Sequence, residues 1–273
     1  MTQLTAMRAG PRDIAALQRL LERDPIATVY LRSELRLNLA SGPWWAIGSG
    51  SELSACALGG PLTVPWIPDP SDASALAEAV SRDGLPRMLV GDRVSVGALH
   101  DAMRPTRRPR QLRDPQPVLA VDRDAWQPPS VGNHRVRRAT RADLEPLILA
   151  AAAMHREEMG IDPLAIDAPA WRHRMVTFVD RGWSWVWMDG PEVIFKAEFS
   201  AWTPECAQLQ GVYVAPMQRR RGVAAAGLAA VVADVLRESA MCALYVNAYN
   251  QPALRLYQRL GFTQRGEFAT VMY

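Results

Sequence analysis

The stretch QRRRGVAA, residues 218–225, joins an apolar sequence typical of a strand to an alanine-rich sequence typical of a helix. The first turn of a helix leaves about four backbone N–H groups without partners, and the helix dipole adds positive charge there. An anionic phosphate satisfies both deficits. Gly222 lets a ligand approach the backbone because it has no Cβ, and the three arginines add charge. The stretch therefore predicts a phosphate-binding turn.

The turn contains neither of two common phosphate-binding motifs, GxxxxGK[ST] and GxGxxG. The longer sequence VYVAPMQRRRGVAAAGL, residues 212–228, resembles instead the acyl-CoA-binding segment of the GNAT superfamily of N-acetyltransferases. The family pattern is Arg or Gln, two residues, Gly, one residue, then Gly or Ala. Arg219, Gly222 and Ala224 fill it in register. The resemblance implies that N–H groups of the loop hold the CoA pyrophosphate, while strand 212–214 pairs with the pantetheine arm.

A second segment, LYVNAYNQPALRLYQRLGF (residues 244–262), resembles the other signature of the same family. That signature is a strand, an asparagine and a helix, which here carries Asn250 and Tyr257. Gly261 also suits the left-handed conformation that commonly ends a helix. The two segments have the order and spacing of the family, and the resemblance covers residues 135–273.

The resemblance implies acetyl-CoA as the cofactor, with CoA as product, and a set of cofactor-binding residues in these two segments. They are Val212, Tyr213, Val214, Arg219, Arg220, Arg221, Gly222, Val223, Ala224, Asn250 and Tyr257. Asn250 could instead only cap the helix that follows it. The backbone N–H of Val214 or of a neighbour is the natural donor to the thioester carbonyl.

Two catalytic residues are expected. Tyr257 stands where many family members carry a tyrosine that protonates the CoA sulfur, and a phenol is protonated at neutral pH. It could instead be a core aromatic on an amphipathic helix. Glu198 is two residues from Lys196 on a predicted strand, so both project from one face, and Glu198 could take the proton of the amine directly or through water. The alternative is a solvent-facing ion pair.

Two further carboxylates are candidates for binding the acceptor. Glu157 and Glu158 end a predicted helix where the family places its substrate-facing loop, so either could bind a cationic amine. The alternative is that both are solvated residues of a helix end. His155 and His173 lack the spacing of metal ligands and are expected to be structural, so no metal site is predicted.

The composition is that of an ordinary globular protein, with 49% hydrophobic and 22% charged residues. A net charge of +3 does not indicate nucleic-acid binding. Three widely spaced cysteines suggest neither a disulfide framework nor a zinc site. No apolar run is long enough for a membrane span and no leader is recognised, so a cytoplasmic protein is expected. Lys196 is the only lysine among many arginines, a bias typical of a GC-rich bacterial genome.

The chain is expected to contain two domains, residues 1–121 and 135–273, joined by a Pro- and Gly-containing linker at 122–134. In the second domain, Thr140 is the expected N-cap of the first helix and Asp189-Gly190 the turn of a hairpin. The fold class is α/β (α+β), with a mixed central sheet flanked by helices as in the GNAT fold.

The first domain shows a similar order, with two helices, a hairpin, and further helices and strands, but it lacks the R-x-x-G-x-A pattern. It resembles a degenerate GNAT copy without a CoA site, and the alternative is an unrelated α/β domain. Trp44, Trp45 and Trp66 could line a wall of the acceptor cleft or pack in the core.

These observations predict an acetyl-CoA-dependent N-acetyltransferase that transfers the acetyl group directly to a primary amine in a ternary complex. The acceptor could be a small molecule or a protein. The two-domain organisation is somewhat similar to that of mycothiol synthases. The alternative function is a non-catalytic acyl-CoA sensor, and neither nucleic acid nor a membrane is an expected partner.

Overall fold

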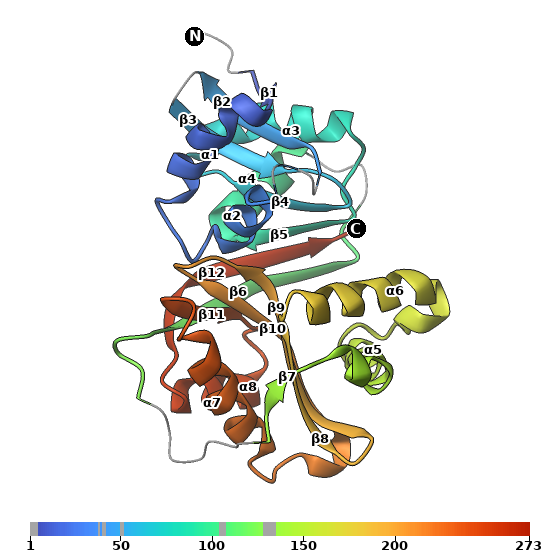
Figure 1. Ribbon diagram of the computed structural model, residues 1–273. Helices are drawn as coiled ribbons and strands as arrows, with labels where there is room; N and C mark the ends of the chain where they lie inside the picture. Colours follow the sequence, from blue (N-terminus) through green and yellow to red (C-terminus); the bar gives the residue numbers. More distant parts are fainter. Residues whose placement is uncertain (1–4, 38, 40–41, 50–51, 104–107, 128–134) are drawn as a thin grey trace. The chain divides into compact units, whose positions relative to one another are not determined.

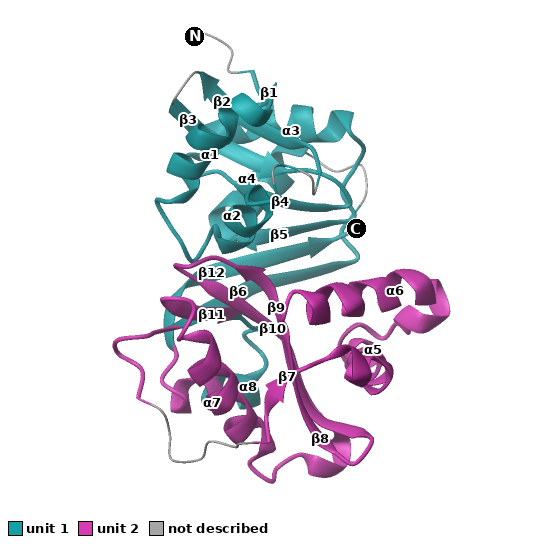
Figure 2. Cartoon of the chain, viewed as in Figure 1, with its two compact units in different colours: residues 1–120, 245–255, 263–273 teal, residues 121–244, 256–262 magenta. Residues whose placement is uncertain are grey.

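The computed structural model describes residues 5–37, 39, 42–49, 52–103, 108–127 and 135–273. Contacts divide the chain into two compact units (Figure 2). Unit 1 contains residues 1–120, 245–255 and 263–273, and unit 2 contains residues 121–244 and 256–262. The predicted division into 1–121 and 135–273 differs from these units, because the C-terminal strand makes its contacts in unit 1. Residues 128–134 of the predicted linker lie outside the described residues.

Unit 1 has the order strand, two helices, three strands, helix, strand, helix, strand (Figure 1). Its elements are β1 (Met7–Arg8), α1 (Ile14–Leu21), α2 (Val29–Leu35), β2 (Trp44–Ser49), β3 (Glu52–Leu58), β4 (Leu62–Trp66), α3 (Ala73–Arg82), β5 (Met88–Asp92), α4 (Arg93–Met103) and β6 (Gln111–Asp122). Strand β4 is absent from the sequence prediction, and Pro65 interrupts its pattern. The C-terminal strand β12 (Thr263–Met272) pairs antiparallel with both β5 and β6 and so completes the sheet of unit 1.

Two hydrophobic cores cover the two faces of this sheet. One contains residues of α3 and α4 together with Trp45, and the other contains residues of α1 and α2 together with Trp44 and Trp66. All three tryptophans are buried. They therefore pack in the core, which was one of the two roles considered for them.

Unit 2 and the segments that follow it repeat the same order of elements. The elements are β7 (Arg137–Arg138), α5 (Leu144–Met159), α6 (Pro163–Asp180), β8 (Ser184–Asp189), β9 (Glu192–Trp202), β10 (Ala207–Val214), α7 (Val223–Val235), β11 (Met241–Tyr245), α8 (Gln251–Arg259) and β12. Helices α5 and α6 lie on one face of strands β8–β10 and α7 lies on the other (Figure 1). Strands β7 to β10 are antiparallel neighbours, and β11 is parallel to β10. The mixed sheet flanked by helices confirms the predicted fold class. Among the described helices, none is both long and apolar enough to span a bilayer.

The predicted start of the first helix of unit 2 is confirmed. Thr140 is the N-cap of a short 3-10 helix (Arg141–Asp143) that leads into α5. The N–H and the hydroxyl of Thr140 both donate to the Asp143 carboxylate, at 2.8 and 2.9 Å. Arg137 donates two further hydrogen bonds to it, at 2.8 and 2.9 Å. These contacts hold the pKa of Asp143 well below its usual range, and the hydrogen bonds from Arg137 contribute most to this lowering.

We expect the variant Asp143→Asn to lower the free energy of unfolding by about 0.5–2 kcal/mol at neutral pH, which is the range for losing a cap. A lowered pKa means that the carboxylate stabilises the fold fully above its ordinary pKa of 3.8, and that this contribution declines as the pH falls below 3.8 toward the lowered pKa of the folded state. Urea unfolding at about pH 7 and about pH 2 checks this, and the difference should be smaller at the lower pH. An equal difference between wild type and variant at both pH values would contradict it.

Candidate functional site

Strand β10 has one edge that is open along most of its length. It pairs with β11 only at Ala207 and Gln208, and no further pair between these strands occurs among the described residues. On the other edge β10 pairs with β9, with a bulge between Gln210 and Tyr213. The N–H of Ala215 donates to the carbonyl of Ile194 near the start of β9, at 3.0 Å. Because successive N–H groups of a regular strand alternate in direction, that of Val214 faces the open edge, and Val212 lies in the bulge beside it.

Among the described residues, the turn after β10 has a row of N–H donors without hydrogen-bond partners. It begins with a short 3-10 helix (Pro216–Gln218), and then Arg220 (φ +62°) and Gly222 (φ +78°) adopt left-handed conformations. The first hydrogen bond of α7 runs from the N–H of Ala226 to the carbonyl of Gly222, at 3.0 Å. Within the part of the chain that the structure describes, the N–H groups of residues 220–225 make no hydrogen bond. Successive N–H groups in such a turn form a concavity suited to an anion.

Arg219 of this turn folds back onto the end of α5. Its Nε donates to the carbonyl of Val214 at 3.0 Å, and its Nη2 lies 2.9 and 2.7 Å from the two carboxylate oxygens of Glu157. Both side chains are about half exposed. Glu157, predicted as an acceptor-binding residue, is therefore the ion-pair partner of the signature arginine. Arg220 and Arg221 are exposed.

Lys196 and Glu198 form an ion pair inside unit 2. The Nζ of Lys196 donates to Oε1 of Glu198 at 2.7 Å and to the carbonyl of Gly211 at 3.0 Å. Lys196 is 0% exposed and Glu198 is 3% exposed. The alternative of a solvent-facing pair is therefore wrong. The two residues lie beside the bulge of β10, where Glu198 pairs across the sheet with Gln210.

Tyr257 is 8% exposed and packs in the core, with its ring centroid 5.8 Å from that of Phe262. Among the described residues its hydroxyl has no hydrogen-bond partner. Burial raises the pKa of Tyr257 well above its ordinary value, and the charges of Glu158 and Cys242 raise it further. The phenol is thus protonated through the neutral range.

The remaining predicted residues have structural contacts. The side chain of Asn250, in unit 1, accepts a hydrogen bond from the N–H of Ala253 at 3.3 Å, so it caps α8. His155 packs against the ring of Trp171, with centroids 5.2 Å apart, and burial lowers the pKa of His155. Gly261 is left-handed (φ +88°), as expected after a helix.

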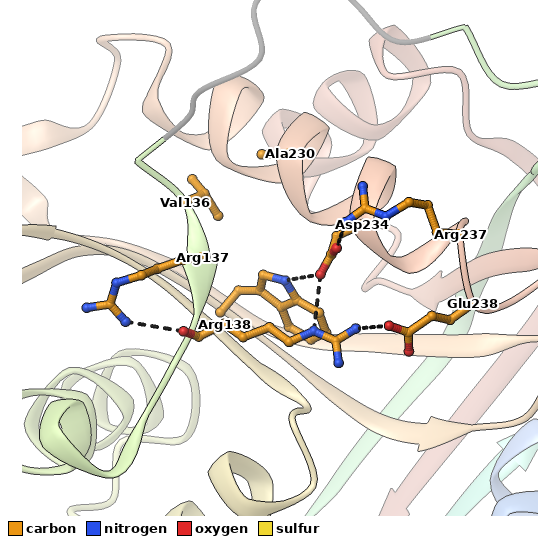
Figure 3. Close-up of a pocket in the computed structure, with 8 residues that line it drawn as sticks. Val136, Arg137, Arg138, Ala230, Asp234, Arg237 and Glu238 are labelled. Carbon is orange, nitrogen blue, oxygen red and sulfur yellow. Dashed lines mark hydrogen bonds and ion pairs between the residues drawn. The ribbon is translucent and has the colours of Figure 1, made fainter.

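A surface pocket of about 540 Å³ lies between β7 and the C-terminal half of α7 (Figure 3). Most of its charged groups pair with one another, and Arg137 pairs with Asp143 outside it. Arg138 contacts Asp234 at 3.1 Å and Glu238 at 2.5 Å, and the indole N–H of Trp185 donates to Asp234 at 3.0 Å. At about 1.5 Å per residue, Asp234 lies roughly 18 Å along α7 from Gly222. This pocket is therefore separate from the turn at the start of α7.

Two family models match parts of this chain. Residues 151–262 match the model of the acetyltransferase (GNAT) family, and residues 42–147 match a domain of unknown function (DUF4081). No curated protein matches the chain significantly.

Solved structures match the chain over its whole length. One is a GNAT-family acetyltransferase from Colwellia psychrerythraea, with a TM-score of 0.64 and 10% identity over 98% of this chain and 99% of that one. Another is a GCN5-related N-acetyltransferase from Sphaerobacter thermophilus, with a TM-score of 0.62 and 18% identity over 100% and 96%. A third is a tandem GNAT protein from the clavulanic acid biosynthesis pathway, with a TM-score of 0.59 and 15% identity over 99% and 98%.

The chain thus has the fold of tandem GNAT proteins. Residues 151–262 form a domain of the GNAT acetyltransferase family. The similarity to mycothiol synthases stays a prediction.

Proposed function

We propose that this protein is an acetyl-CoA-dependent N-acetyltransferase that moves the acetyl group directly to a primary amine. The observation that carries the proposal is that two sets of backbone N–H groups without partners among the described residues lie close together along the chain. In the described structure, the open edge of β10 is followed, after one short 3-10 helix (Pro216–Gln218), by the row of unpaired N–H groups at residues 220–225. A long amide-containing chain that ends in a pyrophosphate would satisfy both.

The turn would hold the pyrophosphate through the N–H groups of residues 220–224, with the positive end of α7 behind them. The N–H groups of Val212 and Val214 would pair with the amides of the pantetheine arm. The N–H nearest the thioester would also stabilise the negative charge that develops on its carbonyl oxygen. Arg219 would fix the turn rather than bind phosphate, because Glu157 already occupies its guanidinium.

Tyr257 would protonate the CoA thiolate as it leaves, since its hydroxyl is protonated and has no other partner among the described residues. Glu198 would take the proton of the amine. Lys196 engages its Oε1, so Oε2 is the oxygen available for this step. Burial raises the pKa of the Cys242 thiol well above its ordinary value, which disfavours a thiolate nucleophile and supports direct transfer.

The acceptor would be recognised beside Glu198, with Glu158 at the end of α5 as a second candidate contact. The Nε2 of Gln210, opposite Glu198, is buried and has no partner within the described chain. A polar group of the acceptor or a water molecule would satisfy it. Glu158 would supply a negative charge that suits a cationic amine. Glu157 forms an ion pair with Arg219.

The proposal is tested by following CoA thiol release from acetyl-CoA with a panel of small amines and peptide N-termini. Amine-dependent release that Tyr257→Phe abolishes supports the enzyme. Tight acetyl-CoA binding without release for any amine would favour the sensor instead. Absence of acetyl-CoA binding would contradict both.

We expect one acetyl-CoA site per chain. In unit 1, the turn after β4 corresponds to the turn after β10, and side chains of unit 1 already accept hydrogen bonds from its backbone N–H groups. After β4, the N–H of Ile67 donates to the buried hydroxyl of Ser95 at 2.9 Å, and that of Ser71 donates to Asp69 at 2.9 Å. The turn also carries two aspartates, Asp69 and Asp72, which would repel a pyrophosphate. Calorimetric titration should give a stoichiometry of about one, and a value of about two would show that unit 1 also binds.

A further inference from the structure

Lys196 forms a hydrogen bond with the backbone of β10 at the bulge between Gln210 and Tyr213. A bulge leaves one residue outside the regular ladder of backbone hydrogen bonds. Here the carbonyl of Gly211 accepts a hydrogen bond from the Nζ of Lys196 at 3.0 Å. Gly211 is half-buried, and leaving its carbonyl unpaired would cost up to about 1–3 kcal/mol, so this contact favours the bulged arrangement over a regular one.

Gly211 and the ion pair fit each other closely. Gly211 has φ +59°, and a Cβ built on it would lie 2.8 Å from Oε2 of Glu198 and 3.2 Å from Nζ of Lys196. Any other residue would be strained by its backbone and would also displace the pair. The three residues therefore act as one unit that links β9 to β10.

Stability alone does not explain a fully buried lysine. Desolvation of two charges often offsets their attraction, and replacing both by neutral groups of similar size is frequently neutral or stabilising. The chain otherwise uses arginine, and Lys196 is its only lysine. An ammonium on a flexible stem can point at one carbonyl and one carboxylate in a space that a planar guanidinium would not fit.

We propose that Lys196 is a positioning residue for acetyl transfer. By holding the bulge at Gly211, it directs the N–H groups of Val212 and Val214 to the open edge, where the pantetheine arm and the thioester carbonyl bind. This inference rests on the proposed acetyl-CoA site. It assigns to the lysine a role distinct from the proton transfer assigned to Glu198.

The double variant Lys196→Met/Glu198→Gln tests the inference because it removes both charges at nearly constant volume. We would measure the Kd for acetyl-CoA and for adenosine 3′-phosphate 5′-diphosphate, the nucleotide half of CoA. The nucleotide should bind as it does to the wild type, since the turn at residues 218–225 is untouched. Acetyl-CoA should bind at least about ten-fold more weakly, because its arm loses aligned donors.

Two further variants separate the possible causes. Glu198→Gln keeps the contact of Lys196 with Gly211, so its acetyl-CoA affinity should stay near that of the wild type while kcat falls. Ser200→Ala is the control. It removes a hydroxyl of β9 that lies 3.3 Å from the carbonyl oxygen and 3.1 Å from the side-chain oxygen of Gln208 in β10, and it should leave both Kd values unchanged.

Several outcomes would overturn the inference. One is a folded double variant that binds acetyl-CoA as tightly as the wild type. Another is an equal loss of affinity in Glu198→Gln, which would assign the effect to the carboxylate. A wild type that binds neither ligand would instead remove the proposed acetyl-CoA site itself.

Discussion

Replacing Gly222 by glutamate should weaken acetyl-CoA binding at least about 100-fold, from a micromolar Kd that corresponds to about −8 kcal/mol. Gly222 precedes the first residue of α7 with φ +78°, and its neighbours 220–225 carry the unpaired N–H groups. A carboxylate there would compete with the pyrophosphate for these donors and repel it. Isothermal titration of wild type and variant measures the difference.

The loss must be separated from a general loss of stability. Apart from its chain neighbours, no described residue has an atom within 4 Å of a Cβ built on Gly222, so the structural cost of the substitution is the left-handed backbone, about 1–2 kcal/mol. Gly190, in the β8–β9 turn, is a matched control, because it is also left-handed (φ +57°) and equally open. Gly190→Glu should lose similar stability and keep acetyl-CoA affinity. Equal binding losses in the two variants would contradict a cofactor site at the turn.

Local sequence features predicted the secondary structure around the candidate site. The arginines and glycine of residues 218–225 indicated a strand-to-helix turn, and β10 does end at Val214 and α7 begin at Val223. Thr140 and Asp189-Gly190 likewise marked a helix start and a hairpin, because capping and tight turns depend on a few adjacent residues.

Contacts between distant residues could not be predicted in the same way. Glu157 and Arg219 are 62 residues apart, so nothing local revealed their ion pair. Pairing of β12 with β5 depends on tertiary structure, which is why the chain order suggested a simpler division into domains. One signal was present in the sequence, because Gly211 inside an apolar strand is typical of a bulge. Its partner Lys196 becomes recognisable only once the strand register is known.

Replacing Tyr257 by phenylalanine should lower kcat at least about 100-fold, the lower range for removing a general acid. Acetyl-CoA affinity should change less than about two-fold, since the aromatic ring that packs on Phe262 remains. Stability should also change little, because within the described residues the hydroxyl has no partner to lose. Tyr273→Phe removes a tyrosine hydroxyl that contacts His100 in unit 1 and should leave kcat unchanged.

The pH dependence of kcat gives an independent check on the same residue. Tyr257 donates a proton only in its neutral form, and burial raises its pKa above the ordinary 10.0. A raised pKa extends the range in which the acid is present toward higher pH. The kcat of the wild type should therefore show no decline between about pH 8 and about pH 10 as the acceptor amine becomes deprotonated. If Tyr257→Phe retained the kcat of the wild type across this range, the leaving thiolate would be protonated by another group, and Tyr257 would be only a core aromatic.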